Sequence, residues 1–417
     1  MTANFLAISI FLFLFFYYKK KYHNNILSGA LIILYTLTFF ASIVYNYSFE
    51  YQSVEVLPIV YLIVVLLLWI SPFNSITNKK ISNLRLTSIQ SRKFIYLYVL
   101  ISMCASVYFS YFSLTSFRLD DFQNARNDIV LYGSILPRNI FSTFFSILSP
   151  LYFVNLVFFF IALRENWNKW VIGSLLFSSF MFPFETLCFF GRDGVLFWCL
   201  NFLILFLLFK NQLRKKERIV IRYLIIFIGL IFTTIFITIS VYRFGKPAIL
   251  NSYQYGTVGS IINYLGQQPR NFTESFNSDV RVNGSLLDGT YRILGKKFGH
   301  IWEDDHELRL FQAGLMSQYN VFGYFVKELI FDYGKSLTIV ISGIFSFLIY
   351  IVRHKLFTRR WNFDLIIIIM IYQIPLNGIF YYRQMVGNQD FSYLLLVIIY
   401  IFLSLFRNWS GMFTPET

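Results

Sequence analysis

Residues 54–71 read VEVLPIVYLIVVLLLWIS, and this stretch decides the class of fold. After Glu55 it carries no charged side chain, and Leu, Ile and Val dominate it. An α-helix needs about 20 apolar residues to cross a bilayer core of about 30 Å. Similar runs recur along the chain with polar connections between them, so the sequence predicts an all-α polytopic membrane protein.

The composition agrees with this interpretation. Hydrophobic residues make up 57% of the 417 residues and charged residues only 14%, whereas soluble domains are about 25% charged. A net charge of +15 would suggest a nucleic-acid partner, but the basic residues lie mostly in short clusters between apolar runs, so we expect none. The three cysteines form no CxxC motif and there are four histidines, so we expect no metal site and no cofactor.

Hydropathy predicts about eleven transmembrane helices. Their approximate bounds are 4–18, 26–47, 54–71, 94–116, 139–163, 170–190, 194–210, 219–241, 334–352, 363–381 and 391–406. Lys and Arg cluster in alternate connections, as in Lys19, Lys20 and Lys21, and the positive-inside rule makes that side cytoplasmic. We therefore expect a multi-pass protein of the bacterial inner (cytoplasmic) membrane, with a periplasmic N-terminus and a cytoplasmic C-terminus.

The spans divide the chain into three regions. An N-terminal membrane bundle covers 1–241, a large periplasmic loop covers 242–333, and C-terminal membrane helices cover 334–417. A loop of this length is usually functional. Its short apolar stretches, 258–265 and 308–315, predict surface helices at the membrane.

Basic residues outside the cytoplasmic clusters are the candidates for chemistry. Arg192 and Asp193 lie between two glycines in a GRDG turn, where they either pair with each other or leave the arginine to bind a phosphate through its planar fork. Arg243, with Lys246 nearby, follows the eighth predicted span and is either an interfacial arginine or a second phosphate ligand.

The large loop holds the densest group of titratable residues. His300 could activate a hydroxyl, since imidazole titrates near neutral pH, while His306 lies among carboxylates. The alternative is that these side chains are solvated loop charges. The candidate substrate-binding residues of the loop, besides Lys246, are Arg270, Arg281, Arg292, Lys296, Lys297 and Trp302.

The layout resembles that of the Wzy-type O-antigen (oligosaccharide repeat-unit) polymerases. The resemblance covers most of the chain and rests on about eleven spans, the GRDG turn at 191–194, one large outside loop before the last three spans, and the Gly-punctuated segment 311–334. It implies an architecture like that of the GT-C polymerases and ligases. It departs from the related ligases, which show a His-x-His-like element, because His300 and His306 are six residues apart.

The resemblance implies an inverting, metal-independent glycosyl transfer on the periplasmic face. Undecaprenyl-pyrophosphate-linked oligosaccharides would be both donor and acceptor, for O-antigen or capsule-type polysaccharide, and a chain-length regulator is a further expected partner. Arg192, Arg243 and Arg292 would stabilise the diphosphate leaving group, and Trp302 would stack on sugars.

Two other readings stay open. The chain could be an O-antigen ligase or another lipid-linked glycosyltransferase of the same architecture. From a different class, it could be a flippase or exporter of lipid-linked glycans, which should place basic residues inside its spans, lining a central cavity.

Overall fold

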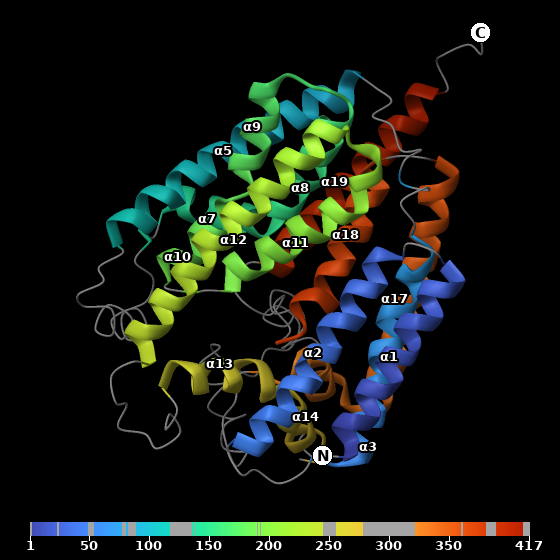
Figure 1. Ribbon diagram of the computed structural model, residues 1–417. Coiled ribbons are helices and arrows are strands. Elements are labelled where there is room, and N and C mark those ends of the chain that lie inside the picture. The colour runs from blue at the N-terminus through green and yellow to red at the C-terminus, as the bar shows by residue number, and fades with distance from the viewer. Residues whose placement is uncertain are drawn as a thin grey trace.

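A computed structural model describes residues 2–22, 25–48, 54–76, 81, 89–116, 136, 137, 139–189, 191, 193–244, 256–277, 322–359, 362–380 and 389–411. Within these ranges every regular element is a helix (Figure 1). The α-helices are α1 (Thr2–Tyr22), α2 (Ile26–Ser48), α3 (Val56–Ile70), α5 (Ile89–Ser116), α7 (Ile140–Leu148), α8 (Tyr152–Arg164), α9 (Lys169–Ser178), α10 (Met181–Cys188), α11 (Asp193–Phe209), α12 (Lys215–Phe244), α13 (Gly256–Gly266), α14 (Gln268–Asn277), α17 (Tyr324–Arg359), α18 (Asn362–Asn377) and α19 (Gln389–Gly411). Short 3₁₀ turns are η1 (Ser71–Ser75), η2 (Ser149–Leu151) and η3 (Lys210–Gln212).

Eight described segments are long and apolar enough to cross a membrane. They are Thr2–Tyr22, Ile26–Ser48, Val56–Asn74, Arg92–Thr115, Ile140–Arg164, Lys169–Cys188, Asp193–Gln212 and Tyr333–His354. Two shorter apolar helices, Phe363–Asn377 and Phe391–Ser404, lie within α18 and α19. The prediction of an all-helical polytopic membrane protein is therefore confirmed.

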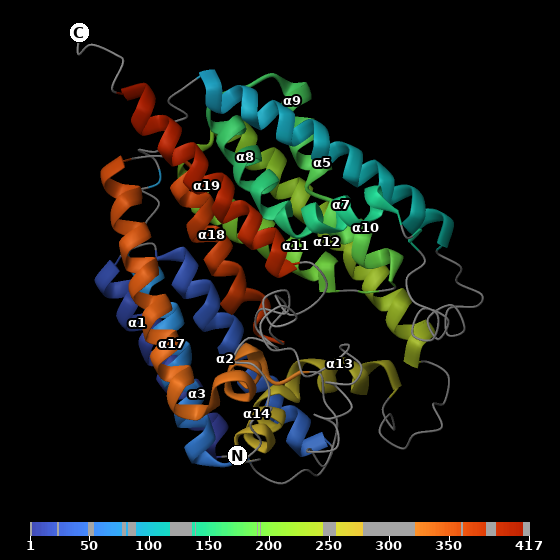
Figure 2. The ribbon, with the colours of Figure 1, turned by 180° about the vertical axis from the view of Figure 1, so that it is seen from behind.

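The helices form two groups that meet along α18 (Figures 1 and 2). One group contains α1, α2, α3 and α17, and the other contains α5, α7 to α12 and α19. Helices α13 and α14 lie at the end of the molecule where the N-terminus is found, which we call the loop end; the C-terminus lies at the opposite end. At the loop end α13 contacts α2, and α14 contacts α17.

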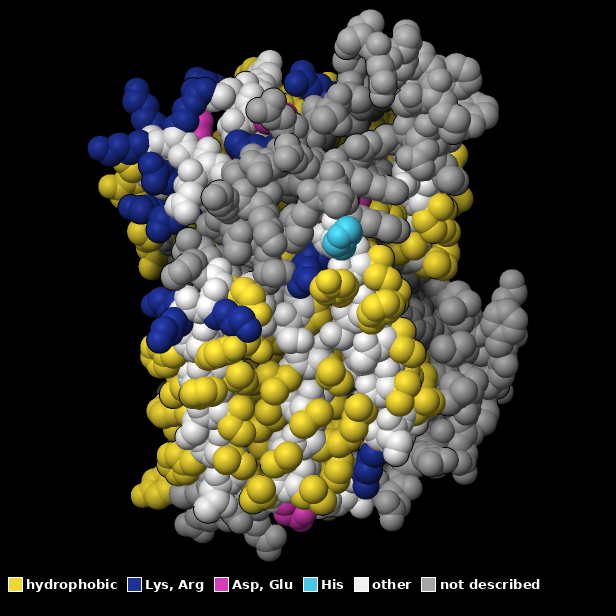
Figure 3. All heavy atoms as spheres, turned by 90° about the vertical axis from the view of Figure 1, so that its right-hand side faces the viewer, with side chains coloured by type: hydrophobic (Ala, Val, Ile, Leu, Met, Phe, Trp, Pro, Cys, Tyr) yellow, Lys and Arg dark blue, Asp and Glu magenta, His cyan; other side chains and the backbone are white. Residues whose placement is uncertain are grey.

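The surface has the banding of a membrane protein. Hydrophobic side chains cover much of the face in Figure 3, and Lys and Arg gather mainly toward the end opposite the loop end, which we call the basic end. On α1, Phe13 and Phe16 are 69% and 63% exposed. Such a surface is unfavourable in water and favourable against lipid.

Two of the candidate spans are broken near their middle. Ser149-Pro150 interrupts the span Ile140–Arg164, because proline lacks the N–H that a continuous helix needs. The hydroxyl of Tyr98 on α5 donates to Leu151 O across 3.0 Å. The span Lys169–Cys188 is broken after Ser178, whose carbonyl accepts from Ser106 Oγ at 3.0 Å.

Helix α17 is broken at Gly334. This glycine has φ 73° and ψ 171°, which is outside the helical region and which glycine adopts without steric cost. Thr338 Oγ1 lies 2.9 Å from Leu329 O and 2.7 Å from Gly334 O, so it covers carbonyls that the break exposes. The part of α17 before the break, residues 324–331, is buried on all sides. The predicted ninth span, 334–352, begins at this break.

The backbone hydrogen-bonding groups at the end of α18 and at the beginning of α17 pair with each other. The backbone N–H groups of Gly323 and Tyr324 donate to Phe380 O at 3.0 and 3.2 Å, and Phe325 N donates to Gly378 O at 2.9 Å. A helix start leaves N–H groups without intrahelical partners and a helix end leaves carbonyls. These bonds therefore join two helix termini without the need for water.

A buried pair of amides joins α11 to α18. Gln373 Nε2 donates to Asn201 Oδ1 at 2.7 Å, and Asn201 Nδ2 donates to Gln373 Oε1 at 2.9 Å. The hydroxyl of Tyr152 on α8 lies 2.6 Å from Asn201 Nδ2. Because each amide is at most 1% exposed, neither can exchange its partner for water.

We expect Asn201→Leu to lower the free energy of unfolding by about 1–3 kcal/mol, because Gln373 would remain buried without its partner. Thermal unfolding of the purified protein in detergent measures this loss. The double variant Asn201→Leu/Gln373→Leu should regain part of it, since no amide is then left unpaired. A single variant that unfolds at the wild-type temperature would contradict this account of the pair.

Candidate functional site

Helices α13 and α14 form a corner of the loop end. Gly266 ends α13 against α2, where an added Cβ would lie 2.6 Å from Ala41 O. Only glycine permits this approach without moving the backbone. The contact fixes the direction in which α14 leaves the corner, and so the positions of its polar side chains.

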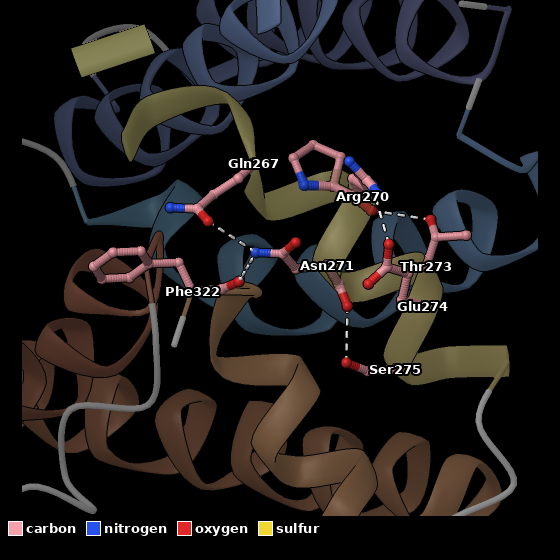
Figure 4. A network of polar contacts seen from close by, with 8 residues as sticks. Gln267, Arg270, Asn271, Thr273, Glu274, Ser275 and Phe322 are labelled. Atoms are coloured by element: carbon pink, nitrogen blue, oxygen red, sulfur yellow. Dashed lines mark hydrogen bonds and ion pairs between the residues drawn. The ribbon is translucent and has the colours of Figure 1, made fainter. Parts of the chain in front are cut away.

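A polar network runs along α14 (Figure 4). Arg270 Nε and Glu274 Oε1 form an ion pair at 3.0 Å, one turn apart on the helix. Asn271 Nδ2 donates to Phe322 O at 2.6 Å and lies 3.2 Å from Gln267 Oε1. Asn271 thereby ties α14 to the segment that leads into α17.

A second ion pair is buried beside this network, at the beginning of α17. Lys327 Nζ lies 3.3 Å from Glu328 Oε1, and the two side chains are 4% and 8% exposed. Moving two charges out of water costs desolvation free energy. The attraction between them offsets this cost only when their geometry is good and further hydrogen bonds are made. The first segment of α17 therefore carries an ion pair within an otherwise apolar, buried stretch.

An aromatic cluster connects four elements at the loop end. Tyr264 of α13 lies 4.6 Å from Phe322 and 5.0 Å from Phe380, measured between ring centroids. Phe380 in turn lies 6.1 Å from Phe197, in the first turns of α11. The cluster brings the start of α11, and with it the GRDG turn, close to α13 and to the start of α17.

The GRDG turn packs back onto α10. Gly191 N donates to Thr186 O at 2.8 Å. A Cβ at Gly194 would overlap the side chain of Thr186, coming within 2.9 Å of its Cβ and closer still to its hydroxyl. The second glycine of the motif is thus required by its contact with Thr186 of α10.

Six residues before Gly191, α10 carries a carboxylate that the sequence reasoning overlooked. Glu185 lies inside the candidate span Lys169–Cys188, is half-buried, and accepts a hydrogen bond from Ser149 Oγ at the break of the other interrupted span. An acidic residue within an apolar run is itself a signal of function. The signal was present in the sequence, but the partner, 36 residues away, was not visible there.

Only some of the predicted site residues belong to the part of the chain that the structure describes. Arg270 lies in the network of α14, where its ion pair with Glu274 offsets part of its charge. Arg243 lies in the last turn of α12, and its side chain is not among those described. The other predicted residues lie outside the described residues: Arg192, Lys246, Arg281, Arg292, Lys296, Lys297, His300 and Trp302. Their roles remain predictions.

Gly194→Ala should lower the free energy of unfolding by about 1–3 kcal/mol, because the new methyl group cannot fit beside Thr186. Thermal unfolding in detergent gives the size of the effect. Gly173→Ala in α9 is the matched control, since no atom lies within 4 Å of its added Cβ, and it should unfold at or above the wild-type temperature. Equal behaviour of the two variants would show that the turn can move away from α10.

No family model, no curated protein and no solved structure matches the chain. The candidate site is therefore defined by its own geometry: the GRDG turn, the α13–α14 corner, the buried start of α17 and the aromatic cluster that joins them.

Proposed function

We propose that this protein polymerises oligosaccharide repeat units carried on undecaprenyl pyrophosphate, as Wzy-type polymerases do. The observation that supports the proposal most is the separation of polar groups between the two ends of the molecule. Lys and Arg clusters lie mainly at the basic end, while the loop end gathers the GRDG turn, two ion pairs and an aromatic cluster. This is the arrangement expected of a membrane enzyme whose chemistry takes place on the face away from the cytoplasm.

The full topology is part of the proposal. Added to the eight candidate spans, α12 with its 30 residues and the apolar helices within α18 and α19 would give eleven. The loop end would then face the periplasm of a bacterial inner membrane, with the N-terminus on that side. The polar segment between α12 and the break at Gly334 would lie above the membrane, next to the GRDG turn.

In the proposed reaction, a hydroxyl oxygen of the acceptor attacks the anomeric carbon of the donor glycan. The bond from that carbon to the diphosphate breaks, and its electron pair leaves with the lipid diphosphate. Cationic side chains stabilise this charge, and Arg192, Arg243 and Arg292 are our candidates. The other basic residues of the loop would bind the two lipid-linked substrates, and aromatic rings would stack on the sugars.

A second candidate function is export of the lipid-linked glycan. Two interrupted spans with a carboxylate between them, Glu185, are typical of transporters as well as of intramembrane active sites. Against this reading, the interiors of the eight described spans carry no Lys or Arg away from their ends, so no cationic path for a diphosphate crosses them. A ligase of the same architecture would share the proposed site.

Deletion of the gene in its host separates these functions. We expect surface lipopolysaccharide capped with a single repeat unit, because the unit is still made, exported and ligated. Electrophoresis of the extracted lipopolysaccharide gives the answer. Lipopolysaccharide without any repeat unit would indicate a ligase or an exporter, and would overturn the proposed polymerase.

In that deletion strain, Arg192→Lys should restore polymerisation at least about tenfold less well than the wild type. Lysine keeps the charge but loses the fork that makes two hydrogen bonds to one phosphate, and a loss of about 1.4 kcal/mol corresponds to a tenfold slower reaction. Chain-length distribution at matched protein levels is the measurement. Arg222→Lys, in α12 at the basic end, is the control and should behave as wild type. Full activity of Arg192→Lys would leave the arginine as a structural partner in the turn.

A further inference from the structure

We propose that an apolar groove across the middle of the membrane binds the polyprenyl chain of a lipid-linked substrate. The groove has a volume of about 180 Å³ and is lined by residues of α5, α7, η2, α8, α18 and α19. We call it the chain groove. The inference rests on the proposed function and adds to it a site for the lipid part of the substrate, besides the polar groups of the loop end.

The chemistry of the chain groove excludes a polar occupant. Among the side chains that line it, the polar atoms are the hydroxyls of Tyr98 and Tyr400, and the other side chains are Phe, Leu, Ile and Val. Tyr98 donates to Leu151 O across 3.0 Å, and Tyr400 donates to Asp364 Oδ1 across 2.6 Å. The lining therefore offers a sugar or a phosphate no charge and no hydroxyl proton. Apolar cavities of about this size stay dry and take up hydrocarbons.

The chain groove is continuous with the surface that faces lipid. Leu97 and Phe144 line the groove and are 58% and 46% exposed, so they lie at its mouth. Beside the lining residues, Leu100 on α5 and Ile398 on α19 are also exposed. Helices α5 and α19 lie on either side of α8 (Figure 2). A hydrocarbon chain can therefore enter from the bilayer without crossing water.

The depth of the chain groove favours a polyprenyl chain over a phospholipid tail. On the span Ile140–Arg164 the lining begins at Phe144 and continues past the break to Val154, a rise of about 15 Å. The middle of this 25-residue span, near Tyr152, falls within that stretch. A bilayer core is about 30 Å thick, so a phospholipid tail ends near its middle. An undecaprenyl chain is longer than one leaflet is thick and can follow the groove from one leaflet into the other.

The interrupted span shapes the walls of the chain groove. Leu148 lies before the break at Ser149-Pro150 and Leu151 lies after it, and both line the groove. A chain that leaves lipid for the groove gains little hydrophobic free energy, because lipid tails are equally apolar. Its binding depends on packing along the groove walls. We therefore expect a long polyprenyl chain to bind more tightly than a short one, which loses part of these contacts.

The test measures the binding of two polyprenyl phosphates to the purified full-length protein by native mass spectrometry. Undecaprenyl phosphate and farnesyl phosphate have the same headgroup, so they differ in the chain alone. We expect the wild type to bind undecaprenyl phosphate at least about tenfold more tightly, which corresponds to about 1.4 kcal/mol.

Variants that fill the chain groove should remove most of this preference. Ile101→Trp fills it from α5, and farnesyl phosphate should still bind within about threefold of the wild type. Ile399→Trp fills it from α19 and provides a second test if the first variant does not fold. Leu100→Trp is the matched control, because Leu100 is next to Ile101 but does not line the groove, and it should keep the wild-type preference.

Several results would overturn the inference. They are equal affinity of the wild type for the two phosphates, a preference that both groove-filling variants retain, and an equal loss in Leu100→Trp. Displacement of undecaprenyl phosphate by an equal concentration of phosphatidylglycerol would assign the groove to ordinary phospholipid. A wild-type dimer that the groove-filling variants convert to a monomer would assign it to a second copy of the chain. A wild type that shows the chain preference but elongates no glycan would overturn the proposed polymerase and leave the ligand class of the groove standing.

Discussion

The structure depends on one constraint: a backbone polar group inside the membrane must find its partner within the protein. Straight helices meet this requirement by themselves, but this chain breaks its helices at Ser149-Pro150, after Ser178 and at Gly334. At the first two breaks a hydroxyl of α5 donates to a backbone carbonyl, Tyr98 to Leu151 O and Ser106 to Ser178 O, so these breaks are also tertiary contacts. At Gly334 the donor is Thr338 of the same helix, which bonds to Leu329 O.

The same constraint explains how the described helices of the loop end are held in place. The termini of α17 and α18 bond to each other, Tyr35 donates to Pro375 O at 2.8 Å, and Asn271 donates to Phe322 O. Apolar packing alone would allow helices to slide in a membrane, where lipid competes for the same surfaces. Directional bonds between particular backbone groups remove that freedom. The polar network around α14 is thus placed by the same bonds that close the helix ends.

Hydropathy was sufficient to predict the class of fold, because a bilayer imposes its thickness on every span. It also predicted a helix near 258–265, where α13 is found, and a span beginning at 334, where Gly334 breaks α17. It did not predict the interrupted spans, the amide pair or the ion pair within α17. Asn201 and Gln373 are 172 residues apart, and the sequence around either residue does not indicate its hydrogen-bond partner. Among the site residues, Arg270 was predicted from its charge. Its ion pair with Glu274 was not predicted, because it depends on where α14 begins.

The overlooked residue shows how charge should be weighed in such a chain. The arginines outside the spans were predicted as site residues because the diphosphate of the expected substrate is an anion. The single Glu in a run of Phe and Leu was not predicted. Yet an arginine outside the membrane costs little free energy, since water can solvate it. The charge of an acidic side chain inside a span must be stabilised by neighbouring groups of the protein. Ser149 supplies part of that compensation for Glu185 through the hydrogen bond from its hydroxyl. A charged side chain that the protein itself must stabilise inside the membrane is therefore stronger evidence of function than a charged side chain that water solvates.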